Sequence, residues 1–173
     1  MPKFNESQAE CLVFTFKDGL LSKIAHDLKI RVTRLSVDVT AVAVRAEFDL
    51  QSLRVVTAMK DGQESPASLS DSDKTKIAEQ IVKEVLHSSE HPSAVFNSRS
   101  VTRRNDGGYS VAGDLTLHGV TKAIHVETQL EGGRQVASVE LQQPDYGITP
   151  FKAMMGTLKV KPDVIVRLSV PQE

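Results

Sequence analysis

The feature that most constrains this chain is a two-residue alternation of apolar and polar side chains. In the stretch VAVRAEFDL, residues 42–50, every second side chain is apolar and most of those between them are charged. Successive side chains of a β-strand point to opposite faces, so this pattern predicts a strand with one buried and one solvated face. The same alternation recurs, with varying regularity, around residues 11–16, 28–32, 94–103, 109–118, 124–127, 135–142 and 164–168.

Turn-forming residues separate these runs and indicate how the strands connect. The sequence NDGG at 105–108, then Gly119, then Gly132 and Gly133 supply the positive φ that tight hairpins require. We count about eight strands, and closing an antiparallel sheet of that size into a barrel leaves no long unpaired edge. A chain of 173 residues is long enough for one sizeable core. The sequence therefore predicts an all-β fold, an eight-stranded antiparallel barrel in a single domain over residues 1–173.

One segment departs from this rhythm and predicts an amphipathic helix at about residues 72–87. Ser70 and Asp73 form a capping-box pattern at its start, and Pro92 prevents the helix from continuing. A helix with one dry face is expected to lie against the barrel or over one of its mouths. Its apolar stripe comprises Ile77, Ala78, Ile81, Val82, Val85 and Leu86.

Composition excludes several classes of partner. Lys and Arg number 21 and Asp and Glu number 22, so no general attraction to nucleic acid or to an anionic membrane is expected. The lack of Trp and the presence of only two Tyr leave few aromatic rings to stack on bases. No apolar run approaches the roughly 18 residues of a membrane-spanning helix. The opening stretch MPKFNESQAECLVF lacks a secretory signal, which predicts a cytoplasmic protein if residue 1 is the native start and leaves localisation open if the chain was trimmed.

The sequence contains no recognised catalytic arrangement. It has no GxSxG motif and no Gly-rich phosphate loop, and its single cysteine, Cys11, lies in an apolar strand and cannot form an internal disulfide. Strand parity places His118 and His125 outward, where structural roles are expected, and no metal-ligand spacing is present. His87 and His91 flank the helix exit, where an imidazole can bond free carbonyl groups. We therefore expect no enzyme, no metal and no cofactor, and catalysis by one of the histidines is the weakest hypothesis.

His26 differs from the other histidines, because parity places it on the inward side of the strand that contains Leu28 and Ile30. An inward imidazole at a barrel mouth can donate a hydrogen bond to the polar end of a ligand; the commoner alternative is a buried histidine satisfied by backbone groups. An eight-stranded barrel is wide enough either to be filled by its own side chains or to hold one small ligand. The residues expected to contact such a ligand are Phe14, Phe16, His26, Leu28, Ile30, Phe48, Phe96, Leu115, Leu117, Met154 and Met155.

Three stretches together resemble the YceI-like family of polyisoprenoid-binding, lipocalin-like barrel proteins. They are GDLTLHGVTKAIHV at 113–126, SSEHPSAVFNSRSV at 88–101 and GLLSKIAHDLKIRV at 19–32. The resemblance covers essentially the whole chain. One departure from it is the segment MKDGQESPASLSDSDKTKIAEQIVKEVL at 59–86, which is longer than its counterpart in many relatives.

The resemblance implies a non-enzymatic carrier that holds an isoprenoid quinone or a polyprenyl lipid inside a lipocalin-like barrel. The alternative is a filled barrel that acts as a protein-interaction or scaffold module through its inserted helix. The expected partner is a lipid rather than nucleic acid. Family likeness and the general frequency of two-fold oligomers are compatible with a homodimer.

Overall fold

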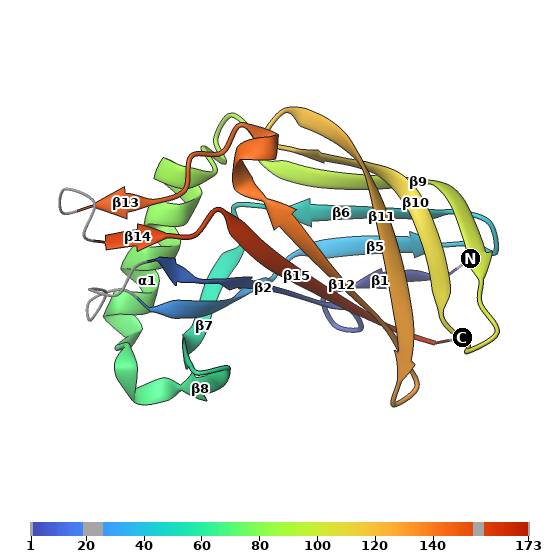
Figure 1. The fold of residues 1–173 in the computed structure, drawn as a ribbon, viewed down its shortest axis with the longest axis horizontal. Helices are drawn as coiled ribbons and strands as arrows, with labels where there is room; N and C mark the ends of the chain where they lie inside the picture. The colour runs from blue at the N-terminus through green and yellow to red at the C-terminus, as the bar shows by residue number, and fades with distance from the viewer. Residues whose placement is uncertain (1, 19–25, 154–157, 173) are drawn as a thin grey trace.

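The structure, a computed structural model, describes residues 2–18, 26–153 and 158–172 (Figure 1). Strands predominate in it, as the alternation predicts. The strand segments are, in chain order, β1 (Lys3–Asn5), β2 (Glu10–Thr15), β3 (Lys17–Asp18), β4 (Asp27–Val32), β5 (Leu35–Val39), β6 (Val44–Asp49), β7 (Leu53–Lys60), β8 (Gln63–Ser65), β9 (Ser93–Arg103), β10 (Tyr109–Leu117), β11 (Val120–Glu131), β12 (Arg134–Gln142), β13 (Lys152–Ala153), β14 (Leu158–Val160) and β15 (Asp163–Pro171).

Two of the barrel strands are long and bent. β4 runs on into β5 and pairs with β7, and β5 pairs with β6, which runs on into β7. The four segments thus form one long hairpin that turns at residues 40–43. Hydrogen bonds from the Thr33 amide to the Ser52 carbonyl (3.1 Å) and from the Asp49 amide to the Arg34 carbonyl (3.0 Å) keep the two strands paired through the bend.

With each bent strand counted once, the antiparallel pairings close into an eight-membered ring. The ring runs from β2 to β4/β5, β6/β7, β9, β10, β11, β12 and β15, and then back to β2. The predicted eight-stranded barrel is therefore confirmed, although the bends and several short segments raise the number of separate strands. The pairing of β11 with β12 involves the fewest residues of any in the ring. These two strands pair only through residues 128–131 and 134–137 and then diverge (Figure 1). The short segments β1 and β8 extend the sheet at β5 and β7, and β13, β14 and β3 form a small separate sheet.

The hairpin turns follow the predicted glycine positions. Between β10 and β11 the two turn residues are His118 (φ 54°) and Gly119 (φ 75°), and between β11 and β12 they are Gly132 (φ 55°) and Gly133 (φ 77°). Two-residue hairpins favour positive φ at both positions, because this backbone twist matches that of the flanking strands. His118 therefore has a left-handed backbone conformation, which residues other than glycine seldom adopt.

The one long helical segment among the described residues begins with the predicted capping box. The Asp73 amide donates to Ser70 Oγ (3.1 Å) and the Ser70 amide donates to Asp73 Oδ2 (3.0 Å). The segment comprises α1 (Asp71–Gln80) and a π-helical continuation, η2 (Ile81–Val85). It ends slightly before the predicted residue 87, because His87 has a φ of 48°, which a right-handed helix cannot continue through.

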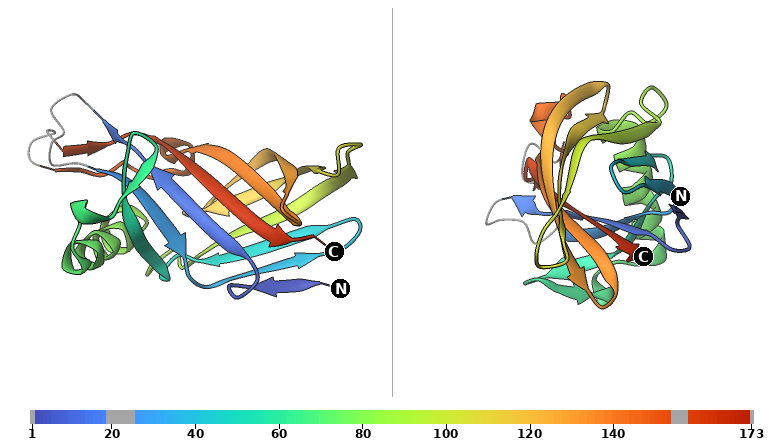
Figure 2. Two further views of the ribbon diagram at one scale, coloured as in Figure 1. Left: turned by 90° about the horizontal axis from the view of Figure 1, so that it is seen from below. Right: turned by 90° about the vertical axis from the view of Figure 1, so that its right-hand side faces the viewer.

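The helix lies across one end of the barrel, against β7, while both chain termini lie at the other end (Figures 1 and 2). Two short 3-10 turns complete the described helices, η1 (Pro66–Ser68) and η3 (Gln143–Tyr146). Among the described residues, no helix is both long and apolar enough to cross a lipid bilayer.

Candidate functional site

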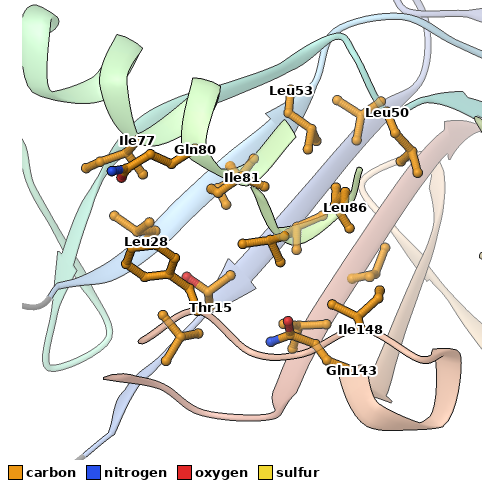
Figure 3. Close-up of a pocket in the computed structure, with 18 of the residues that line it drawn as sticks. Thr15, Leu28, Leu50, Leu53, Ile77, Gln80, Ile81, Leu86, Gln143 and Ile148 are labelled. Carbon is orange, nitrogen blue, oxygen red and sulfur yellow. The ribbon is translucent and has the colours of Figure 1, made fainter. Parts of the chain in front are cut away.

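The barrel interior is hollow, and its first chamber lies beneath the helix. This helix-end chamber has a volume of about 610 Å³ and is bounded by β2, β4 and β15 below and by the helical segment above. Ile77, Ile81 and Leu86 extend from the helical segment on the side that faces Leu28 of β4 (Figure 3). The apolar stripe of the helix is thus turned into the chamber, as one of the two predicted placements requires.

The second chamber occupies the end of the barrel at which the termini lie. This distal chamber has a volume of about 770 Å³, and none of its described lining residues carries a charge. Its polar lining groups include Thr128 and Gln135, which bond one another (2.6 Å), and the Gln135 amide nitrogen also donates to the Gly107 carbonyl (2.9 Å). These polar groups satisfy one another at the chamber wall, so the chamber offers an apolar environment.

Four side chains line both chambers and therefore mark the boundary between them. They are Phe48 of β6, Leu115 of β10, Leu141 of β12 and Val166 of β15, and we call them the girdle. The alternation of each strand explains their position, because the inward residues on either side of a girdle residue belong to different chambers. On β15, for example, Val164 lines only the helix-end chamber and Leu168 lines only the distal chamber.

Polar side chains gather at the helix-end chamber. His26, Asp73, Lys76 and Gln80 line it, together with Gln143, whose amide nitrogen donates to the Lys161 carbonyl (3.1 Å). Hydrogen bonds from the backbone and side chain of Ser70 hold the pKa of Asp73 below its ordinary value, and the nearby charges of Lys76 and His26 act in the same direction. A ligand in this chamber can therefore place a polar group against both hydrogen-bond donors and acceptors.

Most of the predicted contact residues do line this interior. His26, Leu28, Ile30 and Leu117 line the helix-end chamber, Phe96 lines the distal chamber, and Phe48 and Leu115 belong to the girdle. The structure thus brings together residues that are far apart in the sequence. Met154 and Met155 lie outside the described residues.

The inward assignment of Phe14 and Phe16 is wrong. On β2 the residues that line the helix-end chamber are Cys11, Val13 and Thr15, and Phe14 therefore points to the outer face. Phe16 follows the end of β2 and lines neither chamber. The sequence CLVF is apolar at every position, so alternation does not indicate which of these side chains face inward. The prediction placed the aromatic side chain of this stretch, Phe14, inward, which is the opposite of its observed orientation.

Cys11 lies against the helix-end chamber but is not a nucleophile. It is 2% exposed, and burial, with a smaller contribution from Glu10, raises the pKa of its thiol to about 12. The reactive form of cysteine is the thiolate, which this site suppresses at neutral pH.

Sequence reasoning missed a cluster of three histidines outside the chambers. The ring of His118 lies with its centroid 4.5 Å from that of His91 and 5.7 Å from that of His87. His118 Nδ1 bonds the Tyr146 carbonyl (3.2 Å) and must therefore carry the hydrogen. No group of three or more His, Cys, Asp or Glu side chains among the described residues is arranged to hold a metal ion. The cluster joins the helix exit to the β10–β11 turn and to η3, and no spacing in the sequence indicates this meeting.

Comparisons with known proteins agree with this architecture. The sequence model of the YceI-like domain family matches residues 8–171. UPF0312 proteins of Yersinia enterocolitica and Yersinia pestis are 46% identical to this chain over 50 residues, a stretch that spans 29% of this chain and 26% of each of those proteins.

Several solved structures share the fold at low sequence identity. BcnA of Burkholderia cenocepacia is 13% identical with a TM-score of 0.67, covering 95% of this chain and 96% of its own. A polyisoprenoid-binding domain of Saccharophagus degradans is 13% identical with a TM-score of 0.60, covering 94% of this chain and 91% of its own. The YCEI protein of Campylobacter jejuni is 11% identical with a TM-score of 0.57, covering 91% and 90%.

Proposed function

Because this chain belongs to the YceI-like family, we propose that it is a non-enzymatic carrier that holds a long apolar ligand of isoprenoid type inside its barrel. The observation that carries this proposal is the hollow interior, whose distal chamber of about 770 Å³ has no charged side chain among its described lining residues. The domain of Saccharophagus degradans that shares this fold is described as polyisoprenoid-binding, which supports an isoprenoid quinone or a polyprenyl lipid as the ligand class.

The energetics of the two chambers favour a ligand that is mostly hydrocarbon. Burial of apolar surface contributes about 25 cal/mol per Å², before the cost of ordering the ligand is subtracted. An uncompensated charge in an apolar cavity is strongly unfavourable. The apolar part of the ligand therefore occupies the distal chamber, and its polar part stays with His26, Lys76 and Gln80 at the helix end.

The alternative function, a scaffold that binds a protein through its helix, has less support. Such a role is favoured by a filled barrel and by an apolar helix face left open to solvent. Instead, Ile77, Ile81 and Leu86 face the helix-end chamber, and Val85 is buried. The stripe that a protein partner would need is therefore occupied within the fold.

The proposal is tested by extracting the purified protein with organic solvent and identifying the extracted lipids by mass spectrometry. A native mass spectrum of the intact protein gives the stoichiometry. We expect a stoichiometric prenyl-type lipid, or uptake of a prenyl quinone from vesicles that contain it. Protein that is purified empty and takes up neither prenyl quinones nor polyprenyl lipids would contradict the proposal and direct attention to a protein partner.

A further inference from the structure

We propose that the girdle of Phe48, Leu115, Leu141 and Val166 selects ligands by length, because a single linear chain must pass it to occupy both chambers at once. This inference rests on the proposed function, since it requires that the interior holds an apolar chain. It adds the residues that set the length of that chain and the direction in which the chain lies.

The position of the girdle follows from strand register. Val166 pairs with Val139 of β12 and with Val13 of β2, and Leu115 pairs with Phe96 of β9. Of these three partners, Val13 lines only the helix-end chamber, whereas Val139 and Phe96 line only the distal chamber. The boundary between the chambers therefore crosses the barrel at fixed ladder positions.

The size of the chambers supports one long ligand rather than one compact ligand. Small-molecule pockets commonly have volumes of about 300–1,000 Å³. The helix-end chamber, at about 610 Å³, and the distal chamber, at about 770 Å³, each fall within that range. A compact molecule is accommodated by one chamber, whereas only an extended chain uses the apolar surface of both.

The distribution of charge fixes the orientation of the chain. The charged residues that line the interior, Asp73 and Lys76, belong to the helix, and the described lining of the distal chamber has none. A polar head group is therefore placed under the helix, and the end of the tail lies beyond the girdle. The ligand class is a single-chain lipid with a polar head and a tail too long for the helix-end chamber alone.

A series of prenyl alcohols with one to six isoprene units tests this inference. Binding is measured by competition and by native mass spectrometry on the wild type, on Val166→Phe and on Val164→Phe. For the wild type we expect the affinity to rise by about tenfold per added unit, as apolar burial accumulates, past the length that fills one chamber. We also expect two short molecules but one long molecule per protein.

In Val166→Phe the girdle is narrowed, so the affinity should stop rising at a shorter chain length than in the wild type. Val164→Phe is the matched control, because the same substitution two residues away on the same face reduces only the helix-end chamber. It should weaken the short alcohol that occupies the helix-end chamber and every long alcohol, without shortening the chain length at which the affinity stops rising. Val166→Ile adds a single methylene and should shift the length profile in the same direction by less, which keeps the test valid if Val166→Phe folds poorly.

Two results would overturn the inference while leaving the proposed function intact: an identical length profile in the wild type and both Val166 variants, or two long molecules bound per protein. A wild type that binds no prenyl alcohol of any length would instead contradict the proposed function itself. Circular dichroism and thermal unfolding of each variant establish that the barrel is formed.

Discussion

His26 is the residue whose position best links the sequence to a ligand contact. It lines the helix-end chamber near Asp73, whose pKa it helps to lower. We predict that His26→Ala weakens binding of a prenyl quinone by about tenfold, the value of one hydrogen bond of about 1–1.5 kcal/mol. Binding of a hydrocarbon of the same length should change little, and equal losses for both would remove the head-group role of His26. Competition binding with the two ligands makes the comparison.

Gly113 shows how closely the wall is packed at one point of β10. A Cβ atom placed there would overlap the Asn97 carbonyl oxygen and would lie 2.6 Å from the Phe96 ring. Since the carbonyl belongs to the neighbouring strand and cannot move freely, we predict that Gly113→Ala lowers the free energy of unfolding by about 1–3 kcal/mol.

Denaturant unfolding of Gly113→Ala measures this effect. Ala112→Ser, which adds one atom at the adjacent position on the opposite face, is the control and should change stability little. If Gly113→Ala is as stable as the wild type, β9 and β10 separate more easily than their pairing suggests.

Cys11 gives the protein a pH-dependent contribution to stability. The thiol pKa is raised from 9.0 to about 12 by burial, so the unfolded chain loses this proton at a lower pH than the native protein does. Above about pH 9 the unfolded state binds fewer protons, and stability falls by up to about 1.4 kcal/mol per pH unit. Cys11→Ser lacks a group that titrates in this range, so its unfolding free energy should fall less steeply between about pH 9 and 11. Parallel curves for the two proteins would show that Cys11 is accessible to solvent.

At the scale of single elements, the capping box controls how firmly the helix covers the chamber. We predict that Ser70→Ala lowers the free energy of unfolding by about 1 kcal/mol and accelerates ligand release, because α1 begins at this cap. Ser72→Ala is the control, because Ser72 is exposed and lies two residues after the cap. This substitution removes a hydroxyl without removing the cap. An equal change in release rate in both variants would show that the cap does not control ligand release. Stopped-flow transfer of a fluorescent lipid to acceptor vesicles measures the release.

Elements were predictable where one face is charged and the other apolar. The alternation in β6 and the turn at Gly119 place those elements correctly, and the pairing of Ser70 with Asp73 marks the first turn of the helix. On β2 both faces are covered by apolar residues, so the side that bears Cys11 could not be distinguished from the side that bears Phe14. The end of the helix depends on the backbone of His87, which composition does not reveal.

At the scale of the whole molecule, the division of the interior could not be predicted. Strand parity identifies which residues face inward, but the girdle depends on the register of β6, β10, β12 and β15 around the closed barrel. The meeting of His87, His91 and His118 depends on the same long-range pairing. The sequence therefore predicts an apolar interior but not whether that interior is filled.

The hollow interior predicts a large response to hydrostatic pressure. Unfolding eliminates internal voids, so pressure destabilises a protein in proportion to the void volume that is lost. The empty barrel, with chambers of about 610 and 770 Å³, should unfold at a lower pressure than the same protein loaded with a long prenyl lipid. Binding alone also stabilises the loaded form, by about 2.7 kcal/mol at a ligand concentration 100 times Kd.

The two effects are distinguished by the volume change of unfolding, obtained from the slope of the unfolding free energy against pressure. Ligand binding to an already filled barrel raises the midpoint pressure without changing this slope, whereas filling a void makes the slope shallower. Infrared spectroscopy of the amide band follows the transition in a protein without Trp. A prenyl alcohol short enough for one chamber should give an intermediate slope, because it leaves the other chamber empty. Equal slopes for empty and loaded protein would mean that, without a ligand, the chambers either collapse or are filled with water.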